Sequence, residues 1–133
     1  SKKEKSILSQ ILQHDELINE LKQKFNERKF EKVFGNMSTL WQIFILHMIQ
    51  PSEWPLFDKC VYRALNHIQN QEDKRLAPDQ GERLKTYNEE YRPFFKELCN
   101  LSEGYDLFEV DKALWTFGKV VKEYPGLIRN GLD

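Results

Sequence analysis

The stretch that decides the fold is residues 35–65, which read GNMSTLWQIFILHMIQPSEWPLFDKCVYRAL. Its part from 39 to 49 is apolar on nearly every side of a helix, which is typical of a buried central helix. Pro51 and Pro55 end that helix, because proline lacks an amide hydrogen and its ring clashes with the preceding turn. A second helix is predicted over 59–68. The stretch therefore predicts two apolar helices joined by a short, proline-bounded turn.

Asp58 precedes the second of these helices and has two interpretations. Aspartate directly before a helix is a favoured N-cap, because its carboxylate accepts hydrogen bonds from the first backbone amides. A carboxylate that also faces a pocket can act as an acid, a base or a stabiliser of positive charge. The two roles are compatible, and the sequence leaves both open.

Apolar residues recur at three- and four-residue intervals along the rest of the chain, which predicts further amphipathic helices over 6–25, 28–34 and 84–101. Pro93 is expected to kink the third of these helices or to begin a new one. The residues from 69 to 82 are expected to form a loop.

The last helix is predicted to open at Asp106, which forms a capping-box pattern with Glu109. Gly118 in that helix is expected to allow a close helix contact, and Ser38 is expected to cap the helix from 39 to 49. Two inward faces are expected, and they contain Val61, Tyr62, Leu65 and Ile68 in one helix and Val110, Leu114, Phe117, Val121 and Tyr124 in the other.

Length and composition indicate one domain. The 133 residues are 40% hydrophobic, which suffices for a single packed core, and no alternating strand pattern occurs. We expect an all-α fold of about six helices in a single domain over residues 1–133, a count that follows from the helical periodicity.

The charge and the cysteine content of the chain indicate which classes of partner and which compartment to expect. The net charge of −1 gives no global field that would draw the chain onto nucleic acid or anionic lipid. Two cysteines are too few for a disulfide scaffold, and neither a secretory signal nor a run of about 20 apolar residues occurs. We therefore expect a cytoplasmic protein with no membrane partner.

The sequence contains none of the common catalytic or metal-binding patterns. His14, His47 and His67 have no cysteine or histidine at metal-ligand spacing. Cys60 and His67 lie about 10 Å apart along one predicted helix, too far for proton transfer between them. There is no glycine-rich phosphate loop and no serine elbow. We expect neither a metal nor a cofactor.

One resemblance concerns residues 35–65. The segment Gly35-Asn36-Met37-Ser38, the apolar helix after it, and the segment from Pro55 to Ala64 resemble the core of the helix-hairpin-helix DNA glycosylase superfamily. In that family a glycine-rich hairpin precedes an apolar helix, and a proline-aspartate turn then leads into a helix that begins Asp-x-x-Val-x-Arg. Asp58, Val61 and Arg63 match this last element.

The resemblance implies a DNA-binding role for Gly35, Asn36 and Ser38, whose hairpin amides would hold a phosphate. Apart from the resemblance, Lys59 and Arg63, together with Lys74 and Arg75, are expected to form a basic rim near Asp58 that could bind DNA. The resemblance also implies that Asp58 is the catalytic carboxylate, which stabilises positive charge on the sugar or activates the nucleophile after the base is flipped out. No lysine lies between 37 and 46, where bifunctional members carry theirs, so the implied enzyme is monofunctional. The four-cysteine iron-sulfur tail of some members is absent.

A second resemblance carries no activity. Residues 87–95 and 110–119 are similar to segments of uncharacterised bacterial and mobile-element proteins.

Two functions follow as alternatives. The first is a non-catalytic helical module that binds a protein partner or duplex DNA, in which the first helix could also pair with a second copy. The second is a monofunctional DNA glycosylase that uses Asp58, and it requires a concave pocket beside that residue with Trp41, Trp54 or Tyr62 in its wall. We prefer the first, because no complete active site is visible in the sequence.

Overall fold

The structure, a computed structural model, describes residues 2–69 and 74–124. In these ranges all regular secondary structure is helical and no strand occurs, which confirms the predicted all-α class. The chain divides into two compact units, residues 1–54 (unit 1) and 55–133 (unit 2). The expectation of a single domain over 1–133 stays a prediction. No helix in the described ranges is both long enough and apolar enough to cross a membrane.

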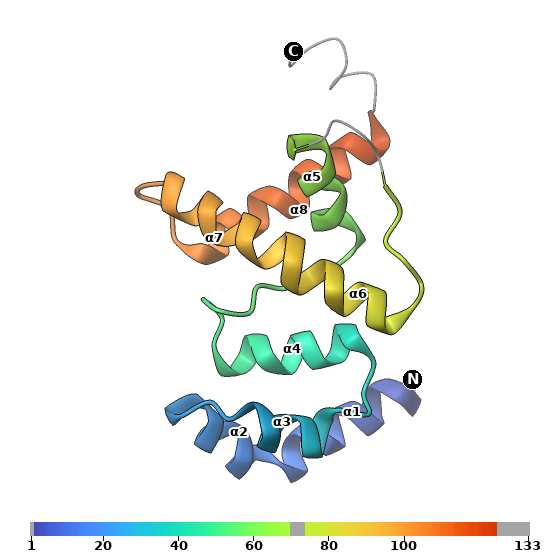
Figure 1. The fold of residues 1–133 in the computed structure, drawn as a ribbon, viewed down its shortest axis with the longest axis vertical. Helices are drawn as coiled ribbons and strands as arrows, with labels where there is room; N and C mark the ends of the chain where they lie inside the picture. The colour runs from blue at the N-terminus through green and yellow to red at the C-terminus, as the bar shows by residue number, and fades with distance from the viewer. Residues whose placement is uncertain (1, 70–73, 125–133) are drawn as a thin grey trace. The chain divides into compact units, whose positions relative to one another are not determined.

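Unit 1 consists of four helices: α1 (Lys2–Gln13), α2 (Asp15–Gln23), α3 (Glu27–Phe34) and α4 (Thr39–Ile49) (Figure 1). The prediction of one helix over 6–25 is wrong, because the helix is interrupted at His14, whose φ of −111° and ψ of 25° are not helical. The His14 ring packs edge-on against Phe34 at 5.7 Å between centroids. Apolar spacing continues across the interruption, so periodicity alone cannot reveal it.

The core of unit 1 is aliphatic with two phenylalanines. Helices α2 and α4 pack against each other, and the buried cluster contains Ile18, Leu21, Phe30, Phe34, Ile45, Leu46 and Ile49. Trp54 packs against this cluster, with its ring 5.8 Å from that of Phe25. Five of the eleven residues of the apolar helix α4 are buried and five are half-buried, while Phe44 is 38% exposed.

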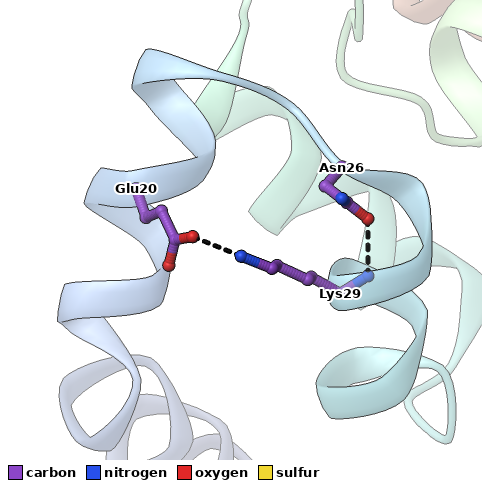
Figure 2. A network of polar contacts seen from close by, with 3 residues as sticks. All are labelled: Glu20, Asn26 and Lys29. Carbon is purple, nitrogen blue, oxygen red and sulfur yellow. Dashed lines mark hydrogen bonds and ion pairs between the residues drawn. The ribbon is translucent and has the colours of Figure 1, made fainter.

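Polar side chains fix the connection between α2 and α3 (Figure 2). Asn26 caps α3, because its Oδ1 accepts a hydrogen bond from the Lys29 amide at 3.0 Å. The Lys29 ammonium also forms an ion pair with Glu20 of α2. Both charged side chains are 54% exposed, so the ion pair contributes little stability and the cap contributes more.

Unit 2 contains α5 (Lys59–Gln69), α6 (Gln80–Thr86), the π-helical turn η1 (Tyr87–Tyr91), α7 (Arg92–Leu101) and α8 (Leu107–Glu123). Helices α6 and α7 follow one another through η1 without a loop (Figure 1). Pro93 lies in the first turn of α7, so it begins a new helix, one of the two expected outcomes. The widened turn before Pro93 accommodates the missing amide hydrogen and the ring.

Helices α5 and α8 lie side by side and form the main helix pair of unit 2 (Figure 1). Gly118 allows their close approach, because a Cβ atom there would lie 1.9 Å from the Cys60 carbonyl oxygen. The predicted close contact at Gly118 is therefore confirmed. The predicted capping box is also present, with Asp106 and Glu109 each bonded to the other's backbone amide.

The core of unit 2 is rich in aromatic rings, and its buried members include Phe57, Tyr62, Tyr87, Tyr91, Phe94 and Phe95. The Phe57 ring lies 5.0 Å from that of Tyr91 and 5.3 Å from that of Tyr87. Two residues expected on inward faces are exposed instead: Ile68 is 48% exposed and Tyr124 58%. Both lie in the last turn or at the end of their helices, where little covers them.

Candidate functional site

The turn at 35–38 in unit 1 is held by one side chain. The Gln42 amide donates hydrogen bonds to the Met37 carbonyl at 2.8 Å and to the Gly35 carbonyl at 3.2 Å. The Gly35 amide in turn donates to the Glu31 carbonyl at 2.8 Å, which ends α3. Gln42 therefore ties the turn to the first turn of α4.

Ser38 stands at the N-cap position of α4, as predicted, with an extended backbone of φ −60° and ψ 154°. Its side chain makes no capping hydrogen bond, so the expected hydroxyl cap is wrong. The Ser38 carbonyl accepts the first helical bond, from the Gln42 amide at 3.0 Å. The first amides of any helix lack intrahelical partners and carry the positive end of the helix dipole, so this end of α4 favours an anion.

An open cavity of about 430 Å³ adjoins the turn. Its lining comes from α1, α3, α4 and the turn itself, and consists of Ser6, Ile7, Gln10, Val33, Asn36, Met37, Ser38 and Trp41. All eight side chains are uncharged, and five of them carry N–H or O–H groups: Ser6, Gln10, Asn36, Ser38 and Trp41. Two of the predicted DNA-binding residues, Asn36 and Ser38, therefore line one cavity, beside Gly35.

Asp58 in unit 2 is the N-cap of α5. Its Oδ1 accepts a hydrogen bond from the Val61 amide at 3.0 Å, and its carbonyl accepts one from the Tyr62 amide at 3.1 Å. The capping interpretation is therefore confirmed. Lys59, which is exposed, and Arg63, which is half-buried, lie one turn apart on the same side of α5.

Tyr91 is a buried polar residue that the sequence reasoning did not single out. Burial raises its pKa far above the usual range, and the nearby carboxylates of Asp111 and Asp58 act in the same direction. No residue in the described ranges accepts a hydrogen bond from its hydroxyl. The Tyr87 hydroxyl differs, because it donates to the Pro55 carbonyl at 2.7 Å. The aromatic run from 87 to 95 signalled a core, but only the structure distinguishes these two hydroxyls.

The predicted site residues fall into two groups, one in each unit. Gly35, Asn36 and Ser38 lie in unit 1, whereas Asp58, Lys59 and Arg63 lie in unit 2. The cavity at the turn is lined by unit 1 residues alone, and Asp58 is not among them.

The three aromatic residues expected around a pocket at Asp58 are placed as follows. Tyr62 is buried, with its ring 5.9 Å from that of Phe57, while Trp41 and Trp54 belong to unit 1. A pocket beside Asp58 therefore stays a prediction. Within 2–69 and 74–124, no three histidine, cysteine or acidic residues come together in a way that could hold a metal ion.

One exposed surface was missed altogether. Sequence reasoning followed the inward face of α8, whereas Phe108 and Trp115 on the outer side are 59% and 42% exposed. A helical projection of 107–123 would have placed these two rings together with three lysines.

Comparison of the chain with protein-family models, with curated proteins and with solved structures finds no match.

Proposed function

We propose that the chain is a non-catalytic DNA-binding module in which the turn at 35–38 and the first amides of α4 hold a backbone phosphate. The observation that carries this proposal is the Gln42 brace, which fixes the turn at the start of an 11-residue helix. Ser38 keeps its hydroxyl out of the cap, so that hydroxyl is available to donate to a ligand.

The chemistry of a helix N-terminus supports a phosphate ligand. Backbone amides and the helix dipole together favour an anion there, and a phosphate can accept several of these hydrogen bonds at once. Contacts to phosphates position a protein on DNA without reading its sequence. With a net charge of −1, the chain depends on such a local site to bind a polyanion.

Asp58 has a structural role at the start of α5. One carboxylate oxygen is already bonded to the Val61 amide, which is the arrangement of a structural cap. Lys59 and Arg63 on the same helix supply positive charge for further phosphates. Capping is compatible with a catalytic role as well, so the preference for a binding module over a glycosylase rests on the braced turn of unit 1.

The experiment compares two substitutions of Ser38 in a binding assay with a fluorescently labelled DNA duplex. Ser38→Asn and Ser38→Asp both keep a favoured capping residue, so α4 is retained in each. Only Ser38→Asp adds a negative charge where the phosphate would lie. We expect Ser38→Asp to weaken binding about tenfold relative to Ser38→Asn, the scale of one lost hydrogen bond to a charged group.

The same assay includes a duplex with an abasic-site analogue and is run at low and moderate salt. Equal affinities of the two Ser38 variants would overturn the phosphate site, and absence of binding at low salt would overturn DNA as the partner. Release of a damaged base by the wild-type protein, lost in Asp58→Asn, would replace the binding module with the glycosylase alternative.

A further inference from the structure

The outer side of α8 carries an aromatic and basic stripe, which we define as Phe108, Lys112, Trp115, Lys119 and Lys122. These positions are four, three, four and three residues apart, so they lie along one side of the helix. All five side chains are exposed. The side chains in this stripe therefore present two ring faces and three ammonium groups, with no carboxylate among them.

The neighbouring acidic residues of α8 lie outside the stripe. Asp111 is half-buried and borders the stripe one turn from Phe108 and Trp115, and Glu109 borders its other edge one turn from Lys112. Glu123 borders the stripe only at its last turn. The charge of the stripe itself is thus +3 over 15 residues of helix, in a chain whose net charge is −1.

The stripe plays no part in the core of unit 2. The opposite side of α8 holds the buried residues, namely Val110, Leu114, Gly118 and Val121. The Lys119 ammonium lies over one face of the Trp115 ring, 4.6 Å from its centroid, and Trp115 is 42% exposed. Exposed rings grouped in this way mark a surface that binds a partner.

We propose that this stripe binds single-stranded nucleic acid, with bases stacked on Phe108 and Trp115 and with phosphates paired to the three lysines. Interleaved aromatic and basic side chains are how proteins hold single strands, because every base offers a ring face and every linkage a negative charge. The two rings are seven residues apart, about 10 Å along the helix, so they contact different bases. The proposal uses residues of unit 2 only and does not depend on the phosphate site at Ser38.

Charge and pattern favour this partner over two others. A second copy of the chain would bring three lysines against three lysines, which is repulsive. A helix that lies in a membrane interface separates its apolar residues from its charged ones, and here lysines stand between the rings. A duplex offers phosphates but keeps its bases stacked on one another, so the rings would gain nothing.

The test measures binding of labelled oligothymidine to the wild-type chain and to the double variant Phe108→Ala/Trp115→Ala. We expect about a hundredfold loss of affinity, since each base stacked on an aromatic ring contributes roughly tenfold or more. The matched control is Tyr124→Ala, which removes an exposed ring at the end of α8 away from the stripe and should leave affinity unchanged. Thermal unfolding of each variant confirms that the fold is retained.

The salt dependence tests the lysines separately. Three phosphate contacts to a single strand predict a slope of about −2 in a plot of log affinity against log salt. Lys112→Gln/Lys119→Gln should make that slope shallower by about 1.4. Lys96→Gln, an exposed lysine on α7, is the control and should change the slope little.

Three results would overturn the proposal: no binding of oligothymidine at low salt, unchanged affinity in Phe108→Ala/Trp115→Ala, or binding of anionic lipid vesicles without binding of oligothymidine. The duplex-binding test of the phosphate site in unit 1 gives a result that is independent of this one. Loss of duplex binding in Ser38→Asp concerns the turn of unit 1, whereas loss of single-strand binding in the ring variant concerns α8.

Discussion

The two units build their cores from different chemistry. Unit 1 contains no tyrosine, and its buried cluster consists of isoleucine, leucine and phenylalanine. Unit 2 contains all five tyrosines, and two of them, Tyr87 and Tyr91, are fully buried. A phenol needs a hydrogen-bond partner when it is buried, whereas an aliphatic side chain does not.

The difference indicates which substitutions should destabilise each unit. Unit 1 depends on the packing of short helices around an apolar cluster, and its candidate site is a turn. Unit 2 depends on one close helix pair and on buried hydroxyls, and its candidate site is the outer side of a helix. Substitutions in unit 2 can therefore lower its stability by creating a cavity, by causing a backbone clash or by changing a buried polar group. Each of these three kinds of substitution is paired below with a matched control.

The largest effect is expected from Leu114→Ala, which empties a buried position of α8. Leu114 is 3% exposed, so the change should lower the free energy of unfolding by about 2 to 5 kcal/mol. Leu101→Ala is the matched control. Because Leu101 is 74% exposed, this substitution should lower the free energy of unfolding by less than about 0.5 kcal/mol. Urea denaturation measures both. Equal costs would mean that α8 does not pack as described.

Alkaline pH should destabilise unit 2. Burial raises the pKa of Tyr87 and Tyr91 far above the value near 10 of a solvated phenol. Above about pH 10 the folded chain keeps two protons that the unfolded chain loses, so stability is intact below that pH and falls as pH rises. The loss is about 1.4 kcal/mol per pH unit for each phenol.

The pH prediction can be measured by denaturation from pH 8 to 11, with ¹⁹F signals from fluorotryptophan at Trp41 and Trp115 reporting on unit 1 and unit 2. We expect the Trp115 signal to show alkaline unfolding first. Tyr87→Phe/Tyr91→Phe is the control and should flatten the pH dependence. An unchanged dependence in that variant would show that these phenols are not its cause.

Gly118→Ala should break the close contact between α5 and α8. The added Cβ would meet the Cys60 carbonyl, a backbone atom, so one helix must shift at a cost of about 1 to 3 kcal/mol. Gly81→Ala, in exposed α6, is the matched control, and its Cβ meets only the end of the Asp79 side chain at 3.3 Å. Thermal unfolding should separate the two. A Gly118→Ala variant as stable as the wild type would contradict the described approach.

Tyr87 and Tyr91 form a matched pair of buried phenols. Tyr87→Phe removes the hydrogen bond to the buried Pro55 carbonyl and should cost about 1 to 2 kcal/mol. Tyr91→Phe removes a hydroxyl that no described residue accepts from, and should raise stability by about 1 kcal/mol. Denaturant unfolding compares them. A loss of stability in Tyr91→Phe would show that its hydroxyl is hydrogen-bonded in solution.

The smallest effect is expected from Asp58→Asn. Asparagine caps a helix about as well as aspartate, so the free energy of unfolding should change by less than about 0.5 kcal/mol. Asp58→Ala removes the cap and should lower the free energy of unfolding by about 1 kcal/mol. Circular dichroism during thermal unfolding measures both. Similar losses in the two variants would mean that the charge of Asp58, and not its capping bond, stabilises unit 2.

The sequence by itself determined the helical class, the caps at Asp58 and Asp106, and the close approach at Gly118. Each of these follows from local chemistry: the period of the apolar residues, the preference of a carboxylate for helix-start amides, and the absence of a Cβ atom. Such signals act over a few residues, so a single chain contains them in full.

Only the tertiary structure decided the interruption at His14, the partners of the buried phenols and the exposure of Ile68 and Tyr124. His14 packs against Phe34, 20 positions later, and the Tyr87 hydroxyl reaches Pro55, 32 positions earlier. Contacts at that separation depend on how helices pack, which leaves no local pattern. For the same reason Ile68 and Tyr124, which the sequence predicts on inward faces, are exposed in the structure.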